Sequence, residues 1–296
     1  NTTMNTKYLI LGAGIGGLAA GAELKKAGEE NFCIVDKCSK LPRNFHNGLH
    51  YLHSCLETPF SCEYKKVVLT EQIWNTRTNT FKYTATIPEM FEYSQKIMEN
   101  IRHPSSIMDP GKRKEVWIPY SNSMDDLLEG YYNYIGAEKF LWNKELIGMD
   151  EGKAIFDDSS MSFEKAISTI PLKAMEIWGI EIKDKLKNKE LYITNYETKN
   201  IVPNWLIVLY MSDPKFPPYR ITVMNNIISM ESMHKLSYEE EGIIKYHIGD
   251  LFDYDLKSKT NYCWETGRIF GIQKHERKEI IEKLIQKNIY PLGRFA

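Results

Sequence analysis

The feature that most constrains this chain is a glycine-rich turn between a short apolar run and a helical pattern. The apolar run is Tyr8–Leu11, and the turn Gly12-Ala-Gly14-Ile-Gly16-Gly17 follows it directly. The segment Leu18–Ala27 then predicts a helix, and Phe32–Val35 predicts a second buried strand that ends at Asp36. This order of strand, helix and strand indicates a βαβ unit.

The glycines and the acidic residue have the spacing of a dinucleotide site. Gly12 permits the tight turn, Gly14 lets the backbone approach a pyrophosphate, and Gly17 lets the helix pack closely on the strand. Asp36 stands where a carboxylate can accept a hydrogen bond from a ribose hydroxyl. A purely structural glycine turn is the alternative. The predicted cofactor-binding residues in this part of the chain are Gly12, Gly14, Ile15, Gly16, Gly17, Asp36, Lys37 and Arg43.

The composition is that of a folded protein without a strong overall charge. Hydrophobic residues make up 43% of the chain, charged residues make up 26%, and the formal net charge is -1. These values give no overall field that would draw the chain onto nucleic acid or an acidic membrane. The basic segment Lys112-Arg113-Lys114 leaves contact with a nucleic acid as an open alternative, which no other feature supports.

The cysteines and the apolar segments narrow the expected environment. The 5 cysteines include no CxxC pair, which argues against a disulfide framework and against a zinc ribbon. We therefore expect a cytoplasmic location and no metal site. The most apolar stretch, Tyr8–Ala22, is interrupted by glycines and is too short to span a bilayer, so we expect no membrane segment.

The remaining hydrophobic patterns predict an α/β fold with two domains. We expect a Rossmann-like domain with a parallel sheet, and a second domain with a mostly antiparallel sheet and helices. The predicted helices are Met90–Ile101, Ser123–Ile135 and Lys274–Lys287. The predicted strands outside the βαβ unit are 67–86, 140–150, 153–156, 166–170, 191–196, 205–211, 219–230, 243–248 and 289–292. The first domain is expected to comprise residues 1–75, 120–180 and 266–296, and the second, substrate-binding domain to comprise residues 76–119 and 181–265.

The last residues of the sequence indicate which dinucleotide is bound. The segment Asn288-Ile-Tyr-Pro-Leu-Gly293-Arg294 is an apolar strand followed by Gly-Arg. It resembles the C-terminal FAD motif of the superfamily of FAD-dependent amine oxidases, protoporphyrinogen oxidases and UDP-galactopyranose mutases, in which the Gly-Arg lies beside the cofactor pyrophosphate. A guanidinium is a good phosphate ligand. The resemblance implies FAD as the cofactor, with Gly293 and Arg294 as contacts. An ordinary surface arginine after a turn is the alternative.

Three segments in the middle of the chain are similar to elements of the same superfamily. Trp117-Ile-Pro-Tyr-Ser-Asn-Ser-Met124 resembles its proline-containing turn before a helix. Asn143-Lys-Glu-Leu146 resembles the strand whose backbone contacts the adenine, which implies Leu146 as a cofactor contact. Ala166-Ile-Ser-Thr-Ile-Pro171 is similar to its element of an apolar strand, Ser or Thr, and Pro.

A fourth segment resembles one branch of the superfamily. Gly48-Leu-His50-Tyr-Leu-His53-Ser54 resembles the segment of UDP-galactopyranose mutases that lies against the flavin. The resemblance implies His50 and His53 as catalytic candidates, because an imidazole there can donate to the flavin or carry a proton. Ordinary polar residues in an irregular loop are the alternative.

Two further catalytic candidates, Tyr219 and Arg220, begin a predicted strand of the second domain. Tyr219 would contribute to an aromatic wall opposite the flavin, and Arg220 would grip a carboxylate or a phosphate. Aromatic residues that belong to the core of the sheet are the alternative.

These features predict an FAD-dependent oxidoreductase, similar to amine oxidases, that oxidises a C–N or C–H bond of a small molecule or a modified nucleotide. One alternative is a non-redox flavin enzyme of the UDP-galactopyranose mutase type, in which reduced flavin acts as a nucleophile. Another alternative is a non-catalytic module that keeps FAD as a structural ligand.

Overall fold

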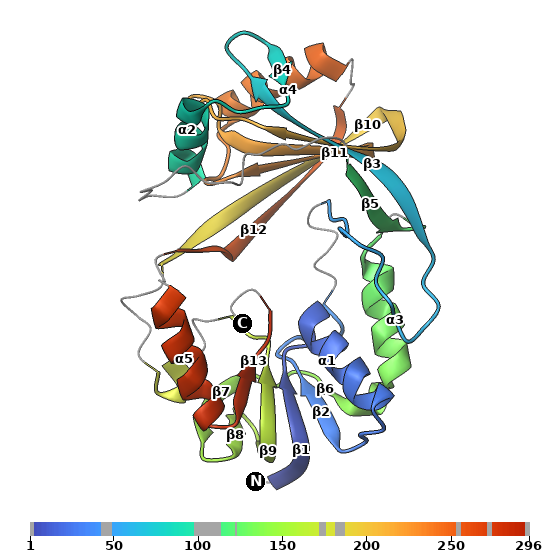
Figure 1. Ribbon diagram of the computed structural model, residues 1–296, viewed down its shortest axis with the longest axis vertical. Coiled ribbons are helices and arrows are strands. Elements are labelled where there is room, and N and C mark those ends of the chain that lie inside the picture. The colour runs from blue at the N-terminus through green and yellow to red at the C-terminus, as the bar shows by residue number, and fades with distance from the viewer. Residues whose placement is uncertain are drawn as a thin grey trace.

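The computed structural model of the chain describes residues 3–42, 49–97, 114–121, 123–171, 176–180, 187–252, 256–270 and 274–293. Figure 1 shows two sheets, one at each end of the molecule, with helices packed around them. The structure is therefore an α/β fold, as predicted.

The first sheet has the strand order β6-β2-β1-β9-β8-β7, and β13 also pairs with β9. Its strands are β1 (Thr3–Leu11), β2 (Phe32–Val35), β6 (Phe140–Leu141), β7 (Leu146–Asp150), β8 (Lys153–Phe156), β9 (Ser160–Ser168) and β13 (Ile289–Pro291). The pairs of β1 with β2 and β9, of β9 with β13 and of β2 with β6 are all parallel. The carboxyl ends of these strands therefore meet at one edge, which points toward the second sheet in Figure 1.

Both faces of the first sheet are covered, because residues of one strand alternate between two clusters. Leu9 and Leu11 pack with helix α5 (Lys274–Gln286), whereas Ile10 packs with α1 (Ile15–Lys26) and α3 (Asp125–Ile135). A short 3-10 helix, η3 (Ala137–Lys139), follows α3. The predicted helices at 123–135 and 274–287 are confirmed within two residues.

The second sheet has the strand order β11-β10-β3-β4, with β12 pairing β10 and β5 pairing β3. Its strands are β3 (Tyr64–Asn75), β4 (Thr80–Lys82), β5 (Lys114–Pro119), β10 (Lys187–Tyr210), β11 (Pro218–Ser232) and β12 (Leu256–Phe270). All of its pairs are antiparallel except that of β10 with β3. Strand β3 lies in this sheet, and the predicted division of the chain into domains, with residues 1–75 in the first, stays a prediction.

Helices α2 (Ile87–Ile97) and α4 (Tyr238–Phe252) pack on the second sheet. Tyr93 and Ile97 of α2 join the cluster on the face that carries Leu49 and Tyr51, and α4 covers the opposite face. The predicted helix 90–101 is thereby confirmed as far as Ile97, and its last residues lie outside the described ranges.

The prediction of a strand at 243–248 is wrong, because these residues lie in α4. The N–H of Ser237 donates to Glu240, and the N–H of Glu240 donates back to the Ser237 hydroxyl at 3.2 Å. This reciprocal pair is a capping box, which starts a helix and outweighs a short apolar run.

Several predicted strands have different bounds in the structure. The predicted strand 140–150 is divided into β6 and β7, and Asn143, at a φ of 55°, lies between them. The predicted strands 191–196 and 205–211 belong to the single element β10, whose register shifts at residues 197, 202 and 206. None of the helices in the described ranges has the length and apolar character that crossing a membrane requires.

Candidate cofactor and substrate site

The glycine turn lies at the carboxyl end of β1, at the edge where the parallel strands end. Gly12 has a φ of 102°, and its N–H donates to the Val35 carbonyl at 2.9 Å. A Cβ on Gly17 would lie only 1.9 Å from the Gly12 carbonyl oxygen. Only glycine therefore allows α1 to pack this closely on the turn.

The N-terminus of α1 is open toward this edge. Gly14 is the N-cap, no side chain caps the helix, and the first turn carries no acidic residue. Among the residues that the structure describes, none would lie within 4 Å of a Cβ on Gly14. The first N–H groups of the helix, which include those of Ile15 and Gly16, have no partner within the helix and carry its positive dipole end. This opening fits a phosphate group.

Asp36 binds the glycine turn on its other side. Its Oδ2 accepts from the N–H of Ala13 at 2.7 Å, and its Oδ1 accepts from the N–H of Cys38 at 2.8 Å. Each carboxylate oxygen has a second lone pair, which can accept a ribose hydroxyl. The neighbouring Lys37 is exposed. Arg43 lies outside the described residues.

The segment before β7 holds the end of β2 in place. The N–H of Asn143 donates to the Cys38 carbonyl, and the N–H of Lys144 donates to the Asp36 carbonyl, both at 2.9 Å. Leu146 follows as the half-buried first residue of β7. Leu146 thus lies two residues after Lys144, whose backbone binds that of Asp36, and it pairs with Phe156 of β8.

The last described residues of the chain return to the glycine turn. Strand β13 pairs with β9, and the N–H of Leu292 donates to the Ser168 carbonyl at 2.8 Å. A Cβ on Gly16 would lie 4.0 Å from the Leu292 side chain. Gly293 follows at a φ of 110° with open space around it. Arg294 lies outside the described residues. The two ends of the sequence therefore meet at the opening of α1.

Thr169 was not predicted from the sequence as a site residue. Its hydroxyl donates to the Leu11 carbonyl at 2.9 Å, and a Cβ on Gly12 would lie 2.5 Å from its oxygen. The signal was present in Ala166-Ile-Ser-Thr-Ile-Pro171, where the polar residue follows the strand that pairs with β1.

The segment with the two histidines lies against the second sheet. Leu52 forms two backbone hydrogen bonds of 2.8 Å with Trp117, and Tyr51 packs on the cluster of this sheet. The ring of His53 is exposed and lies edge-on to Tyr51 at 5.4 Å, while His50 is half-buried. Gly48 lies outside the described residues. The predicted catalytic roles of His50 and His53 stay predictions.

Tyr219 and Arg220 both bind one buried acid, Glu231. The Arg220 Nε donates to Glu231 Oε1 at 2.8 Å, and the Tyr219 hydroxyl donates to the other oxygen. Tyr219 is fully buried, so it cannot form part of an open aromatic wall as predicted. Glu231 already takes up part of the Arg220 guanidinium, and the predicted grip of Arg220 on a substrate anion stays a prediction.

A second buried acid, Glu71, lies on β3, which pairs with β10 on the side opposite to β11. Its Oε1 accepts from the Tyr210 hydroxyl at 2.9 Å, and its Oε2 lies 3.2 Å from the Lys114 ammonium. Burial and the charge of Glu71 raise the pKa of Tyr210, which keeps the phenol protonated as a donor. Burial, and secondly Glu71, also raises the pKa of Tyr51. On an otherwise apolar face of the sheet, a set of polar side chains lies together, which we call the polar row: Glu71, Lys114, Tyr210, Arg220 and Glu231.

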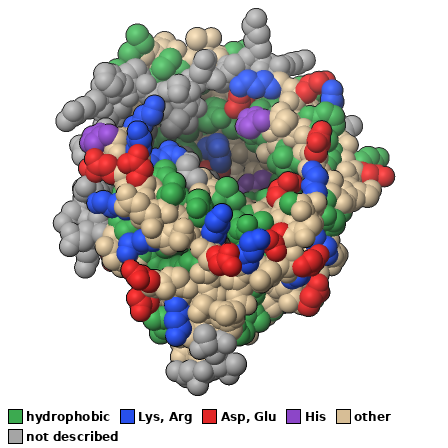
Figure 2. Space-filling model, turned by 60° about the horizontal axis from the view of Figure 1, so that its bottom comes forward, with side chains coloured by type: hydrophobic (Ala, Val, Ile, Leu, Met, Phe, Trp, Pro, Cys, Tyr) green, Lys and Arg blue, Asp and Glu red, His purple; other side chains and the backbone are tan. Residues whose placement is uncertain are grey.

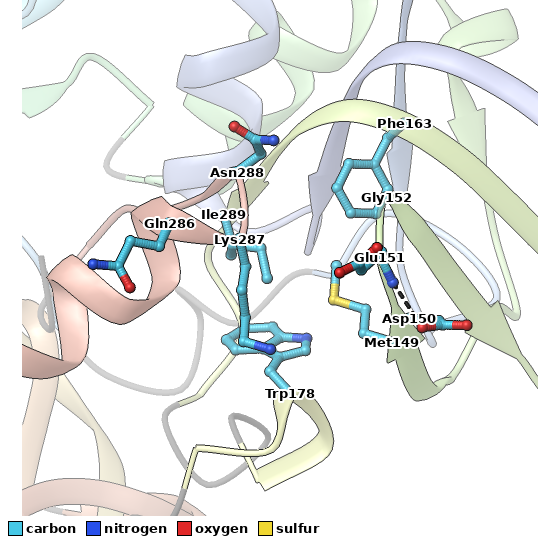
Figure 3. Close-up of a pocket in the computed structure, with 10 residues that line it drawn as sticks. All are labelled: Met149, Asp150, Glu151, Gly152, Phe163, Trp178, Gln286, Lys287, Asn288 and Ile289. Atoms are coloured by element: carbon cyan, nitrogen blue, oxygen red, sulfur yellow. Dashed lines mark hydrogen bonds between the residues drawn. The ribbon is translucent and has the colours of Figure 1, made fainter.

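Figure 2 shows a deep hollow in the molecule, with hydrophobic, basic and histidine side chains in and around it. A separate cavity of about 430 Å³ lies between the β7–β8 turn and the junction of α5 with β13 (Figure 3). Its lining residues are Met149, Asp150, Glu151, Gly152, Phe163, Trp178, Gln286, Lys287, Asn288 and Ile289. None of the predicted site residues that the structure describes lines this cavity, so it is separate from the opening of α1. Within the described ranges, no group of three or more His, Cys, Asp and Glu residues is arranged to hold a metal.

Comparison with known proteins identifies the fold. No protein-family model and no curated protein sequence matches this chain. Among solved structures, a reduced UDP-galactopyranose mutase matches with a TM-score of 0.70 at 16% identity, over 98% of this chain and 88% of its own. A fatty acid isomerase from P. acnes matches with a TM-score of 0.62 at 11% identity, over 97% and 93%. An FAD-dependent oxidoreductase from Pseudomonas aeruginosa matches with a TM-score of 0.60 at 12% identity, over 92% and 80%. The chain therefore has the two-sheet fold found in UDP-galactopyranose mutase and in this FAD-dependent oxidoreductase, as the sequence resemblance predicted.

Proposed function

We propose that this chain binds FAD and is an FAD-dependent oxidoreductase that acts on a small molecule. The observation that carries the proposal is the meeting of the open α1 N-terminus, Asp36 and the Leu292–Gly293 segment at one edge of the parallel sheet. The helix N–H groups would hold the pyrophosphate, and Asp36 would accept the ribose hydroxyls. The similarity in fold to FAD-dependent enzymes supports the same cofactor.

The substrate would lie between this edge and the polar row of the second sheet. Bound FAD supplies hydride acceptance from a C–N or C–H bond. The protein's own contribution is to position the substrate, to exclude water and to hold protons at stated donors, of which the Tyr210 hydroxyl and the imidazoles of His50 and His53 are the candidates.

A non-redox flavin enzyme of the mutase type is the second candidate. It is favoured by the TM-score of 0.70 with UDP-galactopyranose mutase and by the position of the His50–His53 segment against the second sheet. The third candidate, a module that keeps FAD without turnover, predicts tight FAD binding and no response of the flavin to any substrate.

FAD binding is tested by titration of the purified protein, with the Gly14→Ala variant beside the wild type. A Cβ on Gly14 meets no atom of the described residues within 4 Å, so we expect the variant to keep its fold. The methyl group nevertheless stands where a pyrophosphate approaches, and we expect the dissociation constant for FAD to rise about tenfold or more.

Gly242→Ala is the matched control. Gly242 lies on α4, and a Cβ there also meets nothing within 4 Å. This variant should bind FAD as the wild type does. A wild-type protein that binds no FAD, or a Gly14→Ala variant with unchanged affinity, would overturn the assignment of the site.

The reaction class is tested by anaerobic absorbance with amines, amino acids, nucleotide sugars and modified nucleosides. An oxidoreductase bleaches the flavin with its substrate alone. A mutase requires prior reduction of the flavin and shows no net transfer of electrons, and a structural module shows neither behaviour.

A further inference from the structure

Arg220 and Glu231 belong to one strand element, β11, and are nevertheless in direct contact. Eleven extended residues would separate them by roughly 36 Å. Asn225, at a φ of 55°, lies between them, followed by Asn226. The register of β11 against β10 shifts at Asn225, which pairs with Val202, so the chain turns at this point and brings Glu231 to Arg220. The pair is thus built into the second sheet.

Arg220 and Glu231 are open to solvent to different degrees. The side chain of Arg220 is 35% exposed, whereas that of Glu231 is 11% exposed. Burial opposes the charge of Arg220, but the attraction of Glu231 outweighs it and raises the pKa of the guanidinium. An approaching ligand therefore meets a permanently charged arginine with its counter-charge directly behind it.

In the rest of the polar row, too, each positive charge lies beside a negative one. Tyr210 pairs with Arg220 across β10 and β11, and its hydroxyl donates to Glu71. The Lys114 ammonium lies 3.2 Å from the other oxygen of Glu71. Among the described residues of this row, two cations therefore face two carboxylates, and the row has no net charge.

We infer that Glu231 is a specificity-determining residue that adapts this wall to an uncharged hydrogen-bonding group of the substrate, such as a hydroxyl, amide or carbonyl. A free arginine would bind a carboxylate or a phosphate through two parallel hydrogen bonds. Glu231 takes up the Nε and one Nη of Arg220 and repels a second anion. The remaining N–H groups can still donate to a neutral oxygen. The inference rests on the proposed function only in that this wall faces the substrate.

Benzoate and benzamide are suitable probes, because they have the same shape and differ in charge. Binding of each to the protein as purified is measured by calorimetry, and the flavin content of the same preparation is recorded by absorbance. We expect the wild type to bind benzoate at least about tenfold more weakly than benzamide. In Glu231→Gln, which frees Arg220, we expect benzoate affinity to rise about tenfold or more.

The double variant Arg220→Gln/Glu231→Gln is the control, since it removes both charges and should not gain benzoate affinity. A wild type that prefers benzoate, or a folded Glu231→Gln variant without increased benzoate affinity, overturns the inference. Should Glu231→Gln not fold, the wild-type preference alone decides. Loss of FAD binding would instead refute the proposed cofactor, and the two failures are read separately.

Discussion

Replacing Lys96 by methionine removes the amino group that holds helix α2 to the loop between β10 and β11. Four backbone carbonyl oxygens lie within hydrogen-bonding distance of its Nζ, those of Met211 at 3.2 Å, Asp213 at 2.9 Å and Pro218 at 2.6 Å and that of Phe216, and they share its N–H donors. This loop leads directly into the buried start of β11. The lysine thus supports the strand that carries the polar row.

Two effects of opposite sign determine how much Lys96→Met changes the free energy of unfolding. Methionine keeps the volume of the side chain but donates nothing, and a lost buried hydrogen bond costs about 1–3 kcal/mol. Burial, on the other hand, lowers the pKa of Lys96 from 10.5 to about 7. Each tenfold change in proton affinity corresponds to ~1.4 kcal/mol, so the charged form is disfavoured in the fold by a few kcal/mol.

The pH dependence follows from these pKa values. Between pH 7 and 10.5 the unfolded chain binds the proton of Lys96 more strongly than the folded chain does, so wild-type stability from this group rises with pH. Lys96→Met should therefore lower the free energy of unfolding by ~1–3 kcal/mol near the upper end of this pH window. Below the window the wild type is itself less stable by a few kcal/mol, so the loss on substitution should be smaller by that amount.

Urea unfolding at about pH 6 and about pH 10 measures this difference, with Lys26→Met as the control. Lys26 is exposed on the last turn of α1, and its replacement should change stability by less than ~0.5 kcal/mol at either pH. If the difference in the free energy of unfolding between wild type and Lys96→Met were the same at both pH values, the argument that burial lowers the pKa of Lys96 would be refuted.

Three further predictions address the glycine turn and α4. Gly17→Ala should lower the free energy of unfolding by ~1–3 kcal/mol even without FAD, because its Cβ would lie 1.9 Å from the Gly12 carbonyl oxygen; unchanged urea unfolding would contradict this. Asp36→Ala removes the acceptor of two backbone N–H groups, and should weaken FAD binding about tenfold in the same titration; equal affinity would exclude a ribose contact. Ser237→Ala removes the cap on Glu240 and should cost ~1 kcal/mol in thermal unfolding, an effect whose absence would deny the capping box.

The βαβ unit could be predicted because its sequence is dictated by contacts between backbones. Gly12 and Gly17 are required by a positive φ and by a separation that admits no Cβ, and few other arrangements need both. The same holds for Gly293, whose φ of 110° favours glycine. Such requirements restrict the residue type at the position itself, so they can be recognised without knowing the rest of the fold.

The partners of the strands could not be predicted in this way. The run Val67–Thr70 is apolar or β-branched and would suit a strand of either sheet, and only the pairing of β3 with Trp205–Tyr210 places it in the second sheet. The strand predicted at 243–248 is wrong for a related reason. Its apolar residues suit a strand as well as a helix, and the deciding contact lies upstream, at Ser237 and Glu240.

Whether Arg220 can bind an anion depends both on its own residue type and position and on a partner that is distant in the sequence. Its charge and its place at the start of a strand are visible in the sequence and suggest an anion site. Whether it is free depends on Glu231, which is distant in the sequence and becomes its neighbour only because the chain turns at Asn225. The turn signal Asn225-Asn226 lies midway between the two residues, so it could have identified the pair. Where a cation lies near such a turn, the residue opposite it across the turn decides whether it attracts a substrate anion or stabilises the sheet.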